Sequence, residues 1–285
     1  MNRQTTAVAL VVILPAAMGG GCSAILSTGA PLPHDVRERS VEISVHGEPL
    51  TLRLASPQTP VSPSRPLVLY ASGDGGWFGA AVGMFHTIAS SGYPTVGISS
   101  KQLMGTERKR FKPLGVAQVA EGYQQIIAAA RAQLELPADT PVVLTGWSRG
   151  ASLGVLVASR LEADSHVVGL VAIGLAAEEH LDIESDTDDQ DAATDTKVVG
   201  ADVPHARPLA LYPLLSPISP WRTVVVQASG DGYLPAARAR ELFGPDSPNK
   251  RLVAIDARNH RFSGGESTFA AALLDAVGWV VSGGQ

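Results

Sequence analysis

Short apolar runs alternate with helical stretches over most of the chain, and this alternation limits the possible folds more than any other feature. Apolar runs typical of buried strands occur at residues 66–71, 95–99, 142–146, 167–173, 223–228 and 251–256. Helical stretches lie between and after them, at residues 79–90, 116–134, 151–161, 235–243 and 267–281. Strands buried on both faces and alternating with helices form a parallel sheet that helices cover. The sequence therefore predicts an α/β domain with a mostly parallel sheet.

The N-terminal part of this domain has a different pattern. Residues 41–46 and 50–54 alternate in polarity around Gly47 and Glu48, which predicts a β-hairpin. Residues 23–40 are rich in Pro and Ser, and we expect them to be a tether. No linker divides the rest of the chain, so we expect one domain over residues 41–285.

One segment interrupts the alternation. Residues from about 174 to 220 show no strong strand pattern, and residues 182–195 carry seven Asp and Glu side chains without a basic one. A stretch of this length inside a compact domain is either a lid or a solvated mobile loop. We expect a lid-like insertion, and both interpretations of its acidic residues stay open.

The first residues have the layout of an export signal. Arg3 precedes an apolar run at residues 7–14 that is too short to span a bilayer, and small residues follow up to Cys22. Cys22, the single cysteine, stands where a bacterial lipoprotein is cleaved and lipidated, although Gly19 replaces the usual leucine. We expect residues 1–22 to be a signal peptide, and the protein to be periplasmic or held at the cell envelope through a lipid on Cys22. Cleavage without lipidation is the alternative.

Charge and cysteine content exclude several functions. The chain carries 22 basic and 27 acidic side chains, a formal net charge of −5, whereas nucleic-acid binders carry a concentrated basic surface. A single cysteine excludes a disulfide framework and a Cys-rich zinc site. We therefore expect no nucleic-acid partner.

A G-x-S-x-G pentapeptide marks a candidate nucleophile. Residues 146–150, GWSRG, connect the third predicted strand to the next predicted helix. Such a sharp turn lifts Ser148 above the sheet, and bulk at either glycine would collide with neighbouring backbone. We predict that Ser148 attacks the substrate and that the Arg149 amide, at the helix start, is one oxyanion donor. A Gly-Ser turn without chemistry is the alternative.

A serine nucleophile needs a base, and the base needs an orienting carboxylate. In enzymes with this elbow, the acid and then the histidine follow the serine along the chain. Asp231 follows the fifth predicted strand and His260 follows the sixth; His260 is the only one of seven histidines downstream of Asp231. Asp256, four residues before His260, is the rival acid. We predict a triad of Ser148, Asp231 and His260.

The second oxyanion donor should come from the loop after an earlier strand. Residues 72–77, SGDGGW, follow the first predicted strand, and their glycines permit close backbone approach. The amide of Asp74 is the first candidate donor and that of Gly75 the second. The carboxylate of Asp74 either contacts substrate or ties down the turn. The loop lacks the Lys-Ser/Thr ending of a P-loop and the G-x-G-x-x-G spacing of a dinucleotide-binding site, which argues against a phosphate-binding loop.

These motifs together resemble a known superfamily. The order SGDGGW, GWSRG, GDGYLP at residues 230–235 and NHRF at residues 259–262 is similar to that of the α/β-hydrolases. More narrowly, residues 66–281 resemble the bacterial VirJ/AcvB family of exported virulence-associated proteins. SGDGGW is the most specific element, and residues 97–113 also look like the family. The resemblance implies an α/β-hydrolase fold.

The same resemblance implies a periplasmic serine hydrolase that releases the amino acid from aminoacyl-phosphatidylglycerol. Ser148, Asp231 and His260 match the family's triad positions. Two features depart from the family: Arg149 stands where a smaller or aromatic residue is expected, and the acidic insertion is long.

The chain's charges are compatible with lysyl-phosphatidylglycerol. Acidic residues 182–195 would attract its cationic amino acid. Arg108, Lys109, Arg110 and Lys112 either meet its phosphate or the membrane surface, or form a solvated loop. The expected partner is this lipid or another ester, cleaved without metal or organic cofactor. The alternatives are a general carboxylesterase or lipase of the envelope, and a non-catalytic envelope binding protein on the same scaffold.

Overall fold

The computed structural model describes residues 32–58, 65–105, 114–161, 166–181, 208–216 and 221–283. The predicted signal peptide with Cys22, the acidic residues 182–195 and the basic residues 108–112 lie outside these ranges. The expectations for those segments therefore stay predictions.

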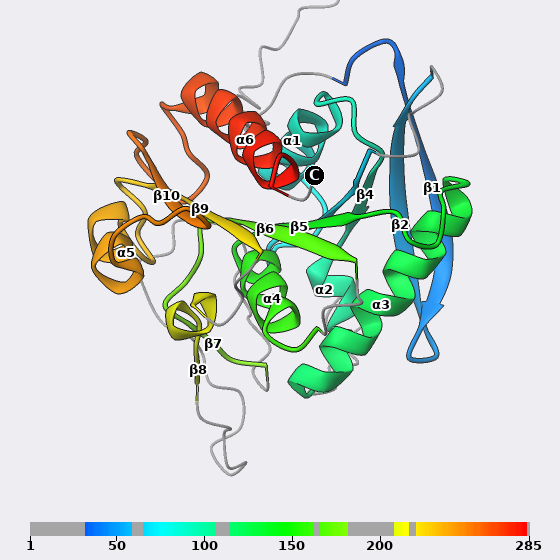
Figure 1. Ribbon diagram of the computed structural model, residues 1–285, viewed down its shortest axis with the longest axis horizontal. Helices are drawn as coiled ribbons and strands as arrows, with labels where there is room; N and C mark the ends of the chain where they lie inside the picture. Colours follow the sequence, from blue (N-terminus) through cyan, green and yellow to red (C-terminus); the bar gives the residue numbers. More distant parts are fainter. Residues whose placement is uncertain are drawn as a thin grey trace, which may run out of the picture.

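Eight strands of the described ranges form one sheet in the order β1-β2-β4-β3-β5-β6-β9-β10 (Figure 1). Their bounds are β1 Val36–Val45, β2 Glu48–Pro57, β3 Leu67–Ala71, β4 Thr95–Ile98, β5 Val142–Trp147, β6 Val167–Ile173, β9 Arg222–Ala228 and β10 Lys250–Ile255. The pairs β1–β2 and β2–β4 are antiparallel, and the remaining pairs are parallel. The predicted α/β architecture with a mostly parallel sheet is thus confirmed.

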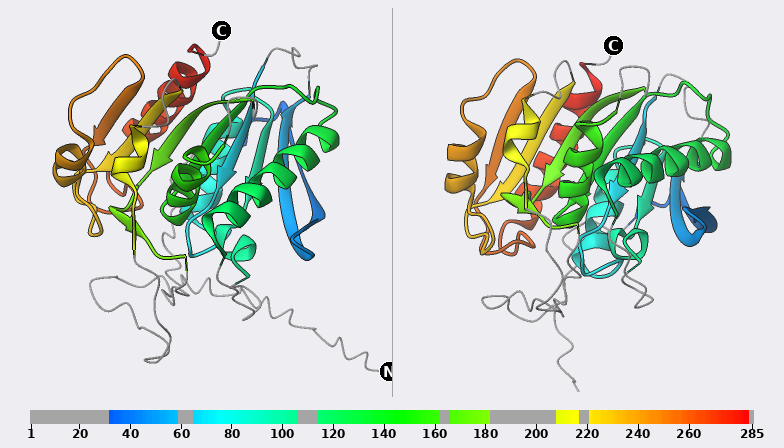
Figure 2. Two further views of the ribbon diagram at one scale, coloured as in Figure 1. Left: turned by 60° about the horizontal axis from the view of Figure 1, so that its bottom comes forward. Right: turned by 90° about the horizontal axis from the view of Figure 1, so that it is seen from below.

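Helices cover both faces of this sheet (Figures 1 and 2). Their bounds are α1 Ala80–Ala89, α2 Ser100–Leu103, α3 Val116–Gln133, α4 Arg149–Ala158, α5 Ala236–Phe243 and α6 Glu266–Val281. Helices α1 and α6 lie on one face, and α3 and α4 lie on the other. Alternate residues of β5 show the division, because Val143 packs with the first pair and Leu144 with the second. The central strands β3, β4 and β5 are buried on both faces for this reason.

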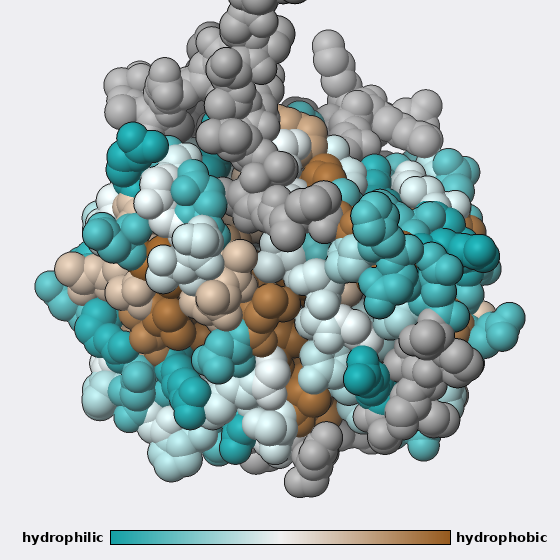
Figure 3. All heavy atoms as spheres, turned by 90° about the horizontal axis from the view of Figure 1, so that it is seen from above, coloured by the Kyte–Doolittle hydropathy of each residue, from teal (hydrophilic) through white to brown (hydrophobic). Residues whose placement is uncertain are grey.

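The outer surface over α1 and α6 is mixed in character. Seen from above the view of Figure 1, the described side chains form small apolar patches between polar ones (Figure 3). Of the helices in the described ranges, none combines the length and apolar character that crossing a bilayer requires.

The N-terminal hairpin is present but longer than expected. Strand β1 pairs with β2 along its whole length, from Val36 opposite Pro57 to Val45 opposite Glu48. Residues 36–40, assigned to the tether, therefore belong to the sheet, and that boundary was wrong. Most side chains of β1 are exposed, since it is an edge strand, so its polar sequence gives little strand signal.

Two short strands, one near each end of the insertion, pair to form a ribbon. Strand β7, Glu178–Glu179, pairs antiparallel with β8, Leu209–Ala210, and a 3₁₀ turn follows at Tyr212–Leu215. These two strands were not identified from the sequence, because two residues are too short to show a period of two. We call β7 and β8 the stem ribbon. Residues 182–207, between the two strands, lie outside the described ranges.

The loop that carries His260 is supported by an aromatic stack against α6. The rings of Phe262 and Phe269 lie 4.2 Å apart between centroids, and both side chains are fully buried. We expect Phe269→Ala to lower the free energy of unfolding by about 3–5 kcal/mol, measured by urea denaturation, because it leaves a cavity. The control Leu242→Ala, at a residue that is 40% exposed, should change it by less than about 0.5 kcal/mol. Equal losses in the two variants would contradict this account of the packing.

Candidate active site

The predicted nucleophile sits on a strained turn. Ser148 joins the end of β5 to the start of α4 with φ 54° and ψ −122°, a conformation that residues with a side chain rarely adopt. The turn is tight, because a Cβ added at Gly150 would lie 2.1 Å from the carbonyl oxygen of Ala71. The Ser148 amide donates to the Ile173 carbonyl at 2.9 Å, and the side chain is partly exposed. The turn therefore holds Ser148 at the C-terminal end of β5.

The predicted acid and base are joined directly. The distance from His260 Nδ1 to Asp231 Oδ2 is 2.7 Å, and Asp231 is only 1% exposed. The other carboxylate oxygen, Oδ1, accepts from the amides of Tyr233 at 2.9 Å and Leu234 at 3.4 Å. A neutral imidazole that donates from Nδ1 keeps a lone pair on Nε2. His260 Nε2 is buried, and no described residue is hydrogen-bonded to it.

His260 packs beside the elbow. Gly174 directly follows Ile173, the acceptor of the Ser148 amide, and a Cβ added at Gly174 would lie 2.7 Å from His260 Cε1. Trp147, the residue before the nucleophile, donates from Nε1 to the His260 carbonyl at 3.2 Å. The structure therefore brings the His260 loop and the Ser148 turn together at the end of β6.

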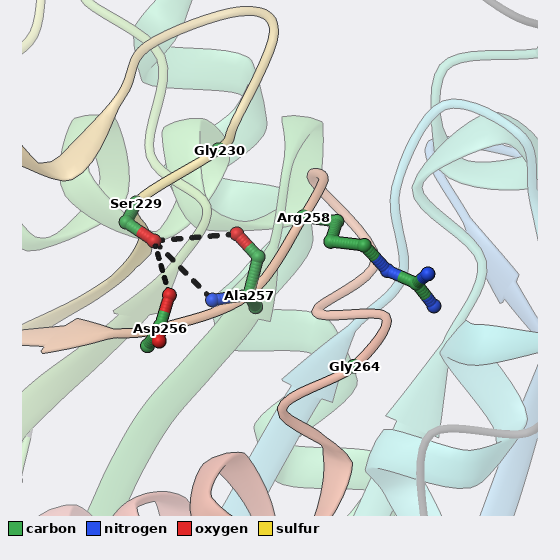
Figure 4. A pocket seen from close by; sticks show the side chains of 6 residues that line it. All are labelled: Ser229, Gly230, Asp256, Ala257, Arg258 and Gly264. Carbon is green, nitrogen blue, oxygen red and sulfur yellow. Dashed lines mark hydrogen bonds between the residues drawn. The ribbon is translucent and has the colours of Figure 1, made fainter.

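The rival acid has a different partner. Ser229 Oγ lies 3.2 Å from Asp256 Oδ1 and accepts from the Ala257 amide at 3.3 Å (Figure 4). These bonds join the loop that precedes Asp231 to the loop that precedes His260. An open hollow of about 650 Å³ lies beside them, lined by Ser229, Gly230, Asp256, Ala257, Arg258 and Gly264. Asp256 thus contributes to fastening the two loops, while Asp231 contacts the imidazole.

The glycine-rich loop after β3 lies against the predicted nucleophile. A Cβ added at Gly73 would be 3.2 Å from the Cβ of Ser148, and Ser100 Oγ donates to the Gly73 carbonyl at 2.7 Å. The Gly75 amide donates to Asp74 Oδ1 at 3.0 Å, so the Asp74 carboxylate ties down the turn. Of the two candidate donors on this loop, the Gly75 amide is thus engaged within the turn, and the Asp74 amide stays the first candidate. The predicted donor outside this loop is the amide of Arg149, which is the first residue of α4 and lies at the positive end of the helix dipole.

Two buried polar residues near the triad were missed by sequence reasoning. Gln227 donates from Nε2 to Asp231 Oδ2 at 3.0 Å and to the Leu234 carbonyl at 2.6 Å. A glutamine in the otherwise apolar run TVVVQA was a signal for it. Glu179 forms an ion pair with Arg149 and gave no signal, because it lies at the margin of the insertion.

Two aromatic rings lie beside the predicted base, His260. The Tyr233 ring meets the His260 ring edge-on at 4.9 Å between centroids, and Trp147 lies 5.4 Å from it. Burial raises the pKa of Tyr212 well above its usual range, and the Asp231 carboxylate adds to the rise. The Tyr212 hydroxyl is therefore neutral. No group of three or more His, Cys, Asp or Glu in the described ranges is arranged to hold a metal ion.

A substitution at Gly174 tests whether the position of His260 matters for the reactivity of Ser148. In Gly174→Ala, the new methyl group would displace the imidazole, and φ of +57° would strain the alanine. We expect fluorophosphonate labelling of Ser148 to slow at least about tenfold, because misplacing a catalytic group by about 1 Å can cost 100-fold. Gly232→Ala is the matched control, since a Cβ there has no neighbour within 4 Å. An unchanged labelling rate in Gly174→Ala would show that the reactivity of Ser148 does not depend on the position of His260.

Comparisons with known proteins agree with the fold. Residues 66–203 match the model of the family described as VirJ, bacterial virulence protein. The sequence has no significant match among curated proteins. The dienelactone hydrolase of Anabaena variabilis is similar at 18% identity and a TM-score of 0.56, covering 85% of this chain and 97% of that chain.

Two further solved structures are similar to the same extent. The esterase domain of a Rhodothermus marinus protein shares 19% identity over 87% of this chain and all of that chain, with a TM-score of 0.56. Est1E from Butyrivibrio proteoclasticus shares 14% identity over 85% of this chain and 99% of that chain, also with a TM-score of 0.56. At such identities the likeness shows a common fold. The resemblance to the VirJ family is thus confirmed over residues 66–203, within a chain that has the α/β-hydrolase fold.

Proposed function

We propose that this protein is a serine hydrolase that cleaves a carboxylic ester through Ser148, His260 and Asp231. The observation that carries the proposal is the 2.7 Å contact between His260 Nδ1 and the buried Asp231 carboxylate. That contact lies beside a serine held at φ 54° on a strand-to-helix turn. Strained backbone at such a turn is a feature of nucleophile elbows.

The first half of the reaction forms an acyl-enzyme. Ser148 Oγ attacks the ester carbonyl carbon as its proton passes to His260 Nε2. The carbonyl oxygen takes the negative charge, and the amides of Asp74 and Arg149 stabilise it. The intermediate then collapses, the bond to the alcohol oxygen breaks, and the imidazolium of His260 protonates the departing alkoxide. Asp231 stabilises the imidazolium and holds the ring orientation throughout.

The second half repeats these steps with water. Water loses a proton to His260 Nε2 as it attacks the acyl carbon, and the same two amides stabilise the second oxyanion. When the bond to Ser148 Oγ breaks, His260 returns the proton to the serine oxygen. The products are a carboxylic acid and an alcohol, and neither a metal nor an organic cofactor enters the steps.

Aminoacyl-phosphatidylglycerol, and lysyl-phosphatidylglycerol in particular, is the proposed substrate. The match of residues 66–203 to the VirJ family supports this choice, since the resemblance implies that lipid. Two exposed aromatic residues on the site loops also fit a lipid ester. Phe78, 43% exposed, follows the oxyanion loop, and Tyr233, 57% exposed, lies beside His260. Apolar side chains exposed at the mouth of a site favour substrates with apolar portions.

A general carboxylesterase is the second candidate. The solved structures with the same fold include proteins named as esterases and a dienelactone hydrolase, which supports ester chemistry without specifying an aminoacyl group. A broad preference for short-chain esters over the aminoacyl lipid would favour this candidate. A binding protein without catalysis is a third candidate, and the ordered contact between His260 and Asp231 argues against it.

Release of lysine from vesicles tests the reaction and its substrate. The chain from residue 23 onward would be incubated with vesicles containing lysyl-phosphatidylglycerol, beside Ser148→Ala, while free lysine is measured. We expect release by the wild type and a loss of about 10⁶-fold in the variant, the order seen when a triad serine is removed. Fluorophosphonate labelling of Ser148 without lysine release would keep the hydrolase and reject the lipid. Equal release by both proteins would reject the nucleophile.

Export and lipidation at Cys22 are part of the proposal. A lipid anchor would hold the enzyme beside a membrane substrate, and one acyl chain alone anchors only marginally whereas further chains hold firmly. We expect the full-length protein to fractionate with membranes in a bacterium that processes lipoproteins, and Cys22→Ala to move to the soluble periplasmic fraction. Mass spectrometry of the mature N-terminus checks the modification directly. An unmodified Cys22 in the wild type would reject the anchor.

A further inference from the structure

The residue after the nucleophile carries a buried positive charge. Arg149 is 9% exposed, and its Nε lies 3.3 Å from Oε1 of Glu179, which is 7% exposed. Removing two charges from water is costly, and removing one partner of such a pair leaves an uncompensated buried charge. The Arg149 side chain is therefore confined to the conformation that keeps this contact.

Glu179 is itself fixed by its surroundings. It lies in β7 opposite Leu209 of β8, so it belongs to the stem ribbon. Its carboxylate accepts from the His180 amide at 3.1 Å and is hydrogen-bonded to the side chain of Ser152, one turn into α4. These contacts join the stem ribbon to the first turn of α4, directly behind the nucleophile.

The carboxylate of Asp74 belongs to the same charged group. Burial raises the pKa of Glu179, Arg149 and the two hydrogen bonds oppose the rise, and the negative charge of Asp74 adds to it. Asp74 therefore lies within electrostatic reach of Glu179. Asp74 and Arg149 are also the residues whose amides are the proposed oxyanion donors. Glu179 is thus ion-paired with the side chain of one proposed donor residue and feels the negative charge of the other.

We propose that Glu179 is a positioning residue for the oxyanion hole. It touches neither the reacting atoms nor the substrate. It holds the Arg149 guanidinium, and through it the first turn of α4, whose amide donates to the oxyanion. This inference rests on the proposed ester hydrolysis, because it assigns a role within that reaction. It also gives the stem ribbon a part in catalysis.

The alternative is that Arg149 binds an anionic group of the substrate and Glu179 only neutralises it. The two roles differ in what they change. Loss of a positioning residue weakens stabilisation of the transition state and lowers kcat, whereas loss of a substrate contact raises KM. An inhibitor that forms a tetrahedral adduct with the serine, such as a boronic acid, reports on the oxyanion hole separately.

The test compares Glu179→Gln with Glu178→Gln in the same chain. Glu178 is the adjacent residue of β7 and is exposed, so it is a matched control. For hydrolysis of a neutral ester that the wild type turns over, we expect Glu179→Gln to lower kcat about 10- to 100-fold. Removal of one oxyanion donor costs about 10²–10³-fold, and a misplaced donor should cost less. KM should stay within about threefold, and boronate affinity should fall in parallel with kcat.

A second variant and a pH profile guard against simple misfolding. Glu179→Asp keeps the charge with a shorter reach, so its kcat should lie between those of the wild type and Glu179→Gln, at an unchanged melting temperature. Protonation of Glu179 removes the same charge as Glu179→Gln. The ratio of wild-type to Glu179→Gln activity should therefore fall as the pH falls through the raised pKa of Glu179. Arg149, Asp74 and His180 are the other charged or titratable groups that face it.

The outcomes separate this inference from the proposed function. If the wild type hydrolyses the ester and the kcat of Glu179→Gln lies within twofold of the wild-type value, the positioning role is overturned and ester hydrolysis stays in place. A rise in KM with unchanged kcat and boronate affinity would overturn it in favour of direct substrate binding. Wild type and Ser148→Ala equally inactive on every ester would reject the proposed function, and the positioning role would fall with it.

Discussion

The backbone of Ser148 adopts a conformation that its surroundings must enforce. A residue held in such a sparsely populated region costs about 1–3 kcal/mol, so the fold around it has to outweigh that strain. The enforcing contacts are close: β5 ends and α4 begins without an intervening loop, and Gly150 lies against the carbonyl of Ala71. Every residue of α4 is buried, so the helix cannot move away to relax the turn. The position of the proposed nucleophile is therefore a property of the packed core.

The same principle extends to the acid and the base through the ends of the strands. The Ser148 amide donates to Ile173, the Gly174 amide donates to Val226, and the Ser229 amide donates to Ile255. These three bonds continue the parallel ladders of β5, β6, β9 and β10 beyond the strand ends. They place the loops of Ser148, Asp231 and His260 at one edge, where parallel sheets carry their sites. A shift in register of any one strand would thus separate members of the proposed triad.

Sequence patterns predicted those parts of the molecule whose physical constraints repeat along the chain. Strands buried on both faces gave apolar runs, and the predicted run at residues 167–173 has the observed bounds of β6. The glycines on either side of Ser148 indicated the strained turn, because bulkier residues would not fit there. His260 was predicted as the base because it is the one histidine after Asp231 in the sequence. Residues 36–40 were not predicted as part of a strand, because an exposed edge strand needs no apolar pattern. Gln227 and Glu179 act through contacts with residues brought close only by the fold.

Arg149 shows how a departure from a family pattern constrains a second segment. A guanidinium buried beside a nucleophile would favour any nearby anion, including the oxyanion of the reaction. In this chain Glu179 holds that charge at 3.3 Å, and the Asp74 carboxylate adds further negative charge, so the side chain acts as a support. A small residue after the serine would need no such partner. The elbow of this protein therefore requires the stem ribbon to be in place, because the ribbon carries the carboxylate that keeps Arg149 buried.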